Sequence, residues 1–147
     1  GSTPLFFVLS ESAARLLISN GASVRSKNND GQEPLHLVCR FGNLNVVKVL
    51  VQLGAQVNAV DRDGRTALHV ACAFHRLVVI RFLIKHGADV NAVDYQGRNP
   101  VFLTATGDAS DLKDEILCFL SDSGADVNAY HDLCTPLVAY VWSSTRR

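Results

Sequence analysis

The chain has 147 residues, of which 48% are hydrophobic and 19% are charged, a size and composition typical of one globular domain rather than a disordered segment. Fourteen Lys and Arg residues balance fourteen Asp and Glu residues, so the basic excess that characterises nucleic-acid-binding proteins is missing. No apolar run is as long as the roughly 18 residues that a membrane-spanning helix needs, so we expect no membrane span.

The chain opens with Gly1 and Ser2, which we interpret as a cloning remnant, and continues into the apolar stretch 5–9. No basic residue precedes this stretch, which argues against a secretory signal and leaves it as a first helix. The four cysteines form no C-x-x-C pair and are too few for a disulfide-stapled secreted domain. We therefore expect free thiols and an intracellular location, in the cytoplasm or the nucleus.

Two short motifs recur along the chain with the same period. The first reads GAQVNA at 54–59 and GADVNA at 87–92 and 124–129, with a diverged copy, GASV, at 21–24. The copies begin 33, 33 and 37 residues apart. The second motif reads TALH at 66–69, EPLH at 33–36 and NPVF at 99–102, with further copies at 3–5 and 135–137. Two independent motifs in step indicate an internal repeat.

Each period predicts the same elements in the same order. Thr66 is placed to cap a first helix, and Pro34 and Pro100 stand where a first helical turn tolerates proline. A second helix follows, with an apolar face at Leu44, Val47, Leu50 and Val51 that is echoed at Leu77, Ile80, Leu83 and Ile84. The motif glycine ends this helix, and D-x-x-G at 61–64 and 94–97 predicts a hairpin tip.

These motifs resemble the ankyrin repeat, whose signature is T-P-L-H-x-A at a period of 33 residues. The resemblance covers the chain from residue 3 onward and is strongest in the two middle copies. It implies an all-α ankyrin-repeat solenoid in which helix-turn-helix units are joined by β-hairpin-like loops. We expect repeats at about 3–32, 33–65, 66–98 and 99–134, with a partial fifth at 135–147.

Several segments depart from the family pattern. Repeat one is short around residues 10–12, repeat four is long within 107–115, and residues 74–76 replace the usual Gly-His. The insertion in repeat four is either drift or a partner-specific feature. Neither terminal helix, at 5–9 or 137–142, has the polar face of a capping repeat. We therefore expect a longer protein, or a partner or flanking domain that covers an end.

The sequence contains no motif that indicates catalysis. We find no phosphate-binding loop and no nucleophile elbow, and we expect no catalytic residue, cofactor or metal. The resemblance gives His36 and His69 a structural hydrogen-bonding role, and small buried packing explains Cys39 and Cys72. We expect His75 and His86 in turns or at the surface.

The resemblance implies that a partner docks on the concave face, which hairpin tips and first helices form. Arg65 and Arg98 are equivalent in successive repeats, as are Phe41 and Phe74. Arginine and aromatic residues often dominate binding energy, although the arginines could be merely solvated and the phenylalanines could fill gaps between helices. The candidate partner-binding residues are Arg40, Phe41, Arg62, Asp63, Arg65, Phe74, Tyr95, Gln96, Arg98 and Trp142.

The sequence thus predicts a non-catalytic scaffold or adaptor module that binds a protein or peptide with acidic and apolar anchors. The alternative is a targeting or regulatory domain of a larger enzyme or channel. We expect no nucleic-acid partner. On this interpretation, changing Arg65 and Arg98 to Glu abolishes binding without lowering the melting temperature.

Overall fold

The computed structural model describes residues 10–107 and 110–129. In these residues the chain forms seven α-helices, and an isolated antiparallel bridge joins Val60 and Thr66. The helices are α1 (Glu11–Ser19), α2 (Pro34–Phe41), α3 (Leu44–Gln52), α4 (Ala67–Ala73), α5 (Leu77–Lys85), α6 (Pro100–Thr106) and α7 (Lys113–Asp122). The expected helix at 5–9, the last hairpin and residues 135–147, with Trp142, lie outside the described residues.

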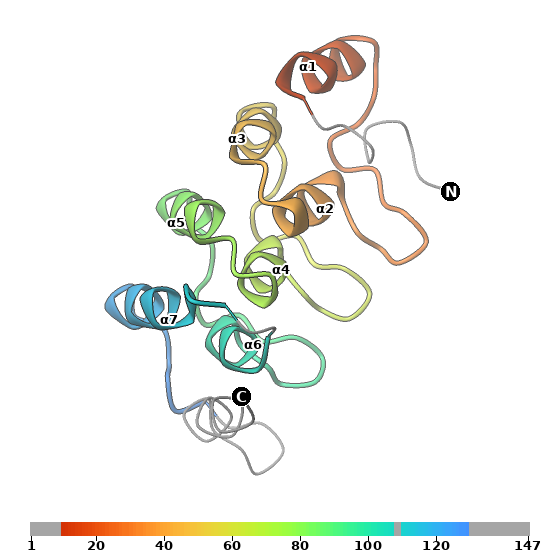
Figure 1. The fold of residues 1–147 in the computed structure, drawn as a ribbon. Coiled ribbons are helices and arrows are strands. Elements are labelled where there is room, and N and C mark those ends of the chain that lie inside the picture. Colours follow the sequence, from red (N-terminus) through yellow and green to blue (C-terminus); the bar gives the residue numbers. More distant parts are fainter. Residues whose placement is uncertain (1–9, 108–109, 130–147) are drawn as a thin grey trace.

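The helices stand in two layers, with α2, α4 and α6 in one and α1, α3, α5 and α7 in the other (Figure 1). Neighbours within a layer contact each other, α2 with α4 and α4 with α6, and likewise α1 with α3 and α3 with α5. The loops between units project from the α2–α4–α6 layer, on the side away from the other layer (Figure 1). The all-α solenoid of helix-turn-helix units is confirmed.

The core lies between the layers and uses the apolar positions that the repeat predicts. Val47, Leu50, Ile80 and Leu83 are essentially inaccessible to solvent, whereas the flanking members of the same face are partly buried. Because α3 and α5 repeat the same face 33 residues apart, each repeat places equivalent side chains over its neighbour. A single unit would leave half of this face exposed, so burial requires stacking.

At the start of α4 and α6, the side chains of Thr66 and Asn99 accept the backbone N–H of the third helical residue. At α2 a capping box brings the Glu33 side chain to the amide of His36 without a side-chain cap hydrogen bond, and this amide donates to the backbone carbonyl of Glu33 at 3.0 Å. At the start of α4 a reciprocal hydrogen bond completes a capping box: Nδ1 of His69 accepts the backbone N–H of Thr66 at 3.1 Å. These bonds satisfy amides that the first turn would otherwise leave without a partner.

The cap of α2 differs from that of α4 because a carboxylate replaces a hydroxyl. Glu33 is 4% exposed, and its Oε2 is buried without a hydrogen-bond partner among the described residues. A buried polar atom without a partner costs roughly 1–3 kcal/mol. The second repeat therefore begins with a cap that is poorer than the equivalent threonine of the third.

We expect Glu33→Thr to stabilise the protein by about 1 kcal/mol, because threonine keeps the cap and removes the unsatisfied oxygen. The measurement is the free energy of unfolding from urea denaturation. The reciprocal variant Thr66→Glu, which places a carboxylate at the equivalent position, serves as the matched control and should destabilise. Equal shifts of the same sign in both variants would contradict this account of the cap.

The second helices end in a repeated left-handed glycine. Gly54 and Gly87 have φ angles of +93° and +85°, a conformation that other residues adopt only at a cost. The amide of the next residue reaches back five positions, as from Ala88 N to Leu83 O at 3.0 Å. This bond satisfies an open carbonyl at the helix end and turns the chain toward the next hairpin.

Side chains of one repeat bind the backbone of the next. Asn58 donates from Nδ2 to Gly87 O at 2.9 Å and accepts from Asp89 N at 3.0 Å. Asn91 makes the equivalent pair of bonds to Gly124 and Asp126, at 3.0 and 2.7 Å. The N of the recurring V-N-A motif therefore joins consecutive repeats, in addition to apolar packing.

The two motif histidines also join consecutive repeats, as the resemblance implied. Nε2 lies 3.1 Å from Arg65 O in His36 and 3.1 Å from Arg98 O in His69. Nδ1 accepts the capping residue's amide, so Nε2 must be the protonated nitrogen of a neutral ring. Burial lowers the pKa of both rings below the ordinary value of 6.5, and nearby carboxylates and backbone carbonyls offset this only in part.

This lowered pKa predicts a pH dependence of stability. The unfolded chain binds protons at these histidines at higher pH than the folded chain, so stability is complete above about pH 6.5 and decreases below it. We expect urea denaturation to give a smaller free energy of unfolding at about pH 5.5 than at about pH 7.5. His69→Gln should reduce this difference, and a stability that stays constant across the interval would contradict the prediction.

The sequence departures in repeats three and four have structural explanations. His75 lies in the α4–α5 turn but is buried rather than at the surface, with φ +52° and Nε2 3.1 Å from Thr104 O. It occupies the position of Gly42 in the preceding repeat. The longer connection of repeat four runs from α6 to α7, where Lys113 is buried and donates from Nζ to Ala105 O at 3.1 Å.

Candidate protein-interaction surface

A buried aspartate organises each regular hairpin tip. Oδ1 of Asp61 accepts the amides of Asp63 and Arg65, each at 2.9 Å. Asp94 makes the same two bonds in the next repeat, also at 2.9 Å. The first tip uses Asn28 instead, which accepts two amides at 3.0 and 2.9 Å. These bonds fix the backbone of the tips and hence the directions of their exposed side chains.

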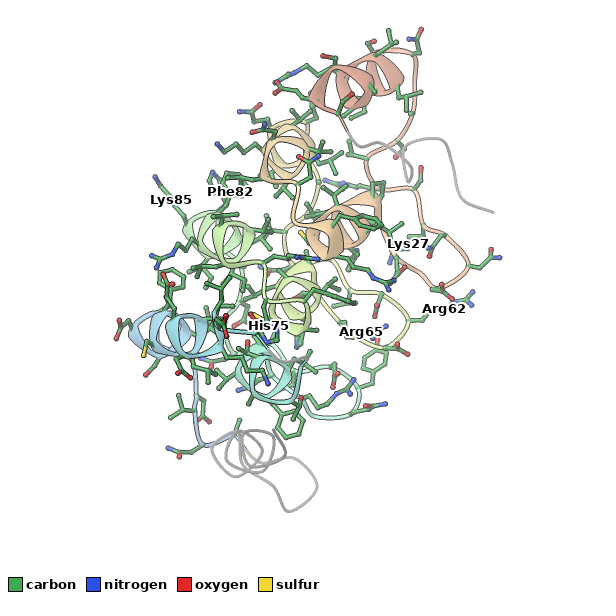
Figure 2. All side chains as sticks on the ribbon, in the orientation of Figure 1. Lys27, Arg62, Arg65, His75, Phe82 and Lys85 are labelled. Atoms are coloured by element: carbon green, nitrogen blue, oxygen red, sulfur yellow. The ribbon has the colours of Figure 1, made fainter. Side chains whose placement is uncertain are left out.

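The tips are also bonded to one another along the stack. Arg62 N donates to Asp30 O at 3.0 Å, and Tyr95 N donates to Asp63 O at 2.9 Å. A Cβ added at Gly64 would lie 2.6 Å from the ring of Tyr95, so only glycine allows this approach. The projecting loops thus form a connected row, and Figure 2 shows Arg62 and Arg65 on them, far from Phe82 and Lys85.

Arg65 and Arg98 are the equivalent arginines of two successive tips, and each pairs with its own tip's aspartate. Arg65 contacts Asp61 at 3.2 Å and Asp63 at 2.6 Å, and Arg98 contacts Asp94 at 2.7 Å. The carboxylates of Asp61 and Asp94 are 1% and 0% exposed. Burial raises the pKa of Asp94, but hydrogen bonds from Arg98 and Gln96 and the Arg98 charge outweigh it, so its pKa is lowered.

These ion pairs change the expectation for the variant in which Arg65 and Arg98 are replaced with Glu: we expect its melting temperature to fall rather than to stay unchanged. A glutamate at either position would stand against a buried carboxylate that has lost its counter-charge. Loss of binding in that double variant could reflect damaged tips rather than a lost contact. Arg65 and Arg98 remain candidate partner-binding residues, but they need a more careful test.

We expect Arg98→Glu to reduce the free energy of unfolding by roughly 1–3 kcal/mol, because it leaves a buried carboxylate without its partner. Arg62→Glu is the matched control. Its guanidinium is exposed and makes no ion pair with any described residue, so its effect should stay within about 0.5 kcal/mol. Thermal and urea denaturation measure both. Equal losses in the two variants would contradict the structural role assigned to Arg98.

The aromatic residues predicted from the sequence differ in exposure. Phe41, at the end of α2, is 61% exposed, and Tyr95, on the third tip, is 76% exposed. Phe74, equivalent to Phe41, is only partly exposed because the guanidinium of Arg40 lies 4.8 Å from the centre of its ring. The alternative that these phenylalanines fill gaps between helices therefore applies in part to Phe74. It does not apply to Phe41, whose side chain is exposed.

Two apolar residues beside the tips were not predicted. Val60 and Val93 directly precede the tip aspartates and are 39% and 57% exposed. They stand 33 residues apart, so the repeat register marks them as equivalent positions, but their exposure becomes clear only in the structure. Together with Tyr95 they give the projecting loops several uncovered apolar side chains, and Phe41 adds another at the end of α2. We call the sequence-predicted residues of the tips and of the helix ends the candidate surface: Arg40, Phe41, Arg62, Asp63, Arg65, Phe74, Tyr95, Gln96 and Arg98.

The cysteines of α2 and α4 are poorly placed to react, whereas Cys118 of α7 is an exposed free thiol. Cys39 and Cys72 are fully buried, as their packing role predicts, and burial raises the pKa of the Cys72 thiol to about 12. A thiol that holds its proton so strongly is a poor nucleophile at neutral pH. No group of three or more His, Cys, Asp or Glu side chains in the described part of the chain is placed to hold a metal ion.

Stacked helical hairpins with a row of projecting tips define a repeat solenoid. A family model described as ankyrin repeats (3 copies) matches residues 5–94 and 54–131, and the chain belongs to this family. A comparison with curated proteins returns no match. Ankyrin repeats are generally protein–protein interaction modules and generally not catalytic. Among the described helices, none is long and apolar enough to cross a membrane.

Proposed function

We propose that this chain is a non-catalytic scaffold or adaptor module that binds a partner protein or peptide on its concave face, across the candidate surface. The observation that carries the proposal is the exposure of the Tyr95 and Phe41 rings, at 76% and 61%. Large aromatic side chains are costly to leave in water and are enriched among the residues that dominate binding energy.

The rigidity of the candidate surface supports the same function. Asp61 and Asp94 hold two of the tips through paired backbone bonds, and each tip is bonded to its neighbour. A surface whose backbone is already fixed loses little conformational entropy on association. Exposed side chains can therefore vary at positions such as Arg62 and Tyr95 without altering the tip on which they stand.

A protein partner is favoured over a nucleic acid by the mixed charge of the tips. Asp30 and Asp63 are exposed on the tips, as is Arg62. Their carboxylates would repel the phosphate backbone of a nucleic acid.

The test selects peptides from a randomised displayed library on the folded domain and measures their affinity for variants. Phe41→Ala and Tyr95→Ala should each weaken binding roughly tenfold or more, because each removes an exposed aromatic anchor. The matched control is Val78→Ala. Val78 is 56% exposed, but it lies on α5, in the layer away from the projecting loops. Selected peptides that bind both the Phe41→Ala and the Tyr95→Ala variants as tightly as the wild type would contradict the proposed surface.

A further inference from the structure

Two arginines from consecutive repeats meet where the helices of the α2–α4–α6 layer end. The guanidinium of Arg40, in the last turn of α2, lies over the ring of Phe74 at 4.8 Å. Arg76, in the α4–α5 turn, donates from Nε to the backbone carbonyl of Arg40 at 2.9 Å. A Cβ added at Gly42 would lie 2.8 Å from Cδ of Arg76, so glycine makes room for this side chain. We call Arg40, Phe41, Phe74 and Arg76 the arginine–phenylalanine corner.

The charges of this corner are not neutralised within the described part of the chain. Arg65, Arg81 and Arg98 each pair with a carboxylate, whereas neither Arg40 nor Arg76 has an acidic side chain within 4.0 Å among residues 10–107 and 110–129. Both arginines are exposed, and Phe41, the next residue after Arg40 in the chain, is 61% exposed. Among the described residues the corner thus presents two cations without a carboxylate partner, at the end of a helix that also exposes an aromatic ring.

We infer that the arginine–phenylalanine corner binds an acidic peptide segment of the partner, in which a Glu or Asp side chain stands next to an aromatic or large aliphatic residue. This inference rests on the proposed function and specifies the partner's chemistry. The planar guanidinium group matches a carboxylate through two parallel hydrogen bonds. Stacking on Phe74 already orders the Arg40 side chain, so binding costs less side-chain entropy there than at a free arginine.

The position of the corner fits the length of an extended segment. The eight residues of α2 separate the corner from the projecting tips, and at about 1.5 Å per residue the helix spans roughly 12 Å. An extended chain covers that distance in about four residues. One short segment could therefore place an acidic group at Arg40 and Arg76 and reach the tips of the candidate surface.

A discrete acidic segment fits better than a polyanion. The corner holds two cations, while exposed carboxylates at Asp30 and Asp63 stand on the tips. A long polyanion would meet these carboxylates as well as the arginines. A peptide can place its charges at the corner and neutral residues over the tips.

The experiment uses the same randomised displayed library on the intact chain, followed by anisotropy measurements with the recovered peptides. We expect the peptides to be enriched in Asp or Glu beside an aromatic or large aliphatic residue, and their affinity to decrease as salt is raised. The double variant Arg40→Glu/Arg76→Glu should bind them roughly tenfold more weakly or worse. Far-UV circular dichroism melts check its fold, and Arg40→Gln/Arg76→Gln removes both charges with a milder change.

The matched control is Lys48→Glu/Lys85→Glu, which changes the net charge by the same amount on exposed positions of the outer helices α3 and α5. Figure 2 shows Lys85 on the side away from the projecting loops. This variant should bind the peptides as the wild type does. Equal weakening in both double variants would mean that net charge, rather than the corner, governs binding, and would overturn the inference.

The other outcomes separate the inference from the function on which it rests. If the recovered peptides are not enriched in acidic residues but their affinity still depends on Phe41 and Tyr95, the proposed function stands and the inference of an acidic partner segment is overturned. A single-stranded oligonucleotide that competes as well as the peptides would likewise overturn it in favour of a general anion site. Recovery of no peptide that depends on Phe41 or Tyr95 would contradict both.

Discussion

The structure depends on hydrogen bonds that each repeat makes to the backbone of the next. Asn58 and Asn91 bind the loop that follows the second helix of the neighbouring repeat, and His36 and His69 bind the carbonyls that precede its first helix. Apolar contacts alone would tolerate sliding between helices, whereas these bonds have direction and fix the offset at one repeat. The regular spacing of the projecting tips follows from that fixed offset, so the interaction surface inherits its geometry from bonds inside the stack.

This dependence divides the exposed residues into two groups. Arg65 and Arg98 form ion pairs with Asp61 and Asp94 and so stabilise the tips, which means that their charges are already neutralised within the chain. Arg62 and Tyr95 stand on the same tips without holding them, and their side chains remain open to a partner. The sequence marked all of these positions as candidates because they share the hairpin register. Only the hydrogen bonds of the structure separate those that support the surface from those that are free to bind.

The capping motifs and the motif glycines were sufficient to predict the helices of the middle repeats and their ends, because these features depend on residues close together in the chain. The stacking of the units was implied by the resemblance to the ankyrin repeat. The pairing of Arg98 with Asp94 is also local, four residues apart, and the D-x-x-G-R spacing could have suggested it. Contacts between repeats were harder to predict. Arg76 reaches the carbonyl of Arg40, 36 residues away, and His75 is buried against Thr104, 29 residues away. Both depend on the packing of one helix end against the next, which the sequence period places near each other without specifying which side chain fills the space.

The zero net charge of the chain conceals an uneven distribution of charge along the stack. The first turn of α7 carries Asp114 and Glu115, whereas α3 and α5 contain no acidic residue. Arg65 and Arg98 pair with the aspartates of their own tips, whereas Arg40 and Arg76 have no acidic partner among the described residues. A whole-chain sum therefore says little about the field that a partner meets, because salt screens interactions beyond about 10 Å and each repeat is about that wide. A partner approaching the end of α2 encounters Arg40, Arg76 and the exposed Phe41, while Glu115 of α7 is already paired with Arg81 of α5.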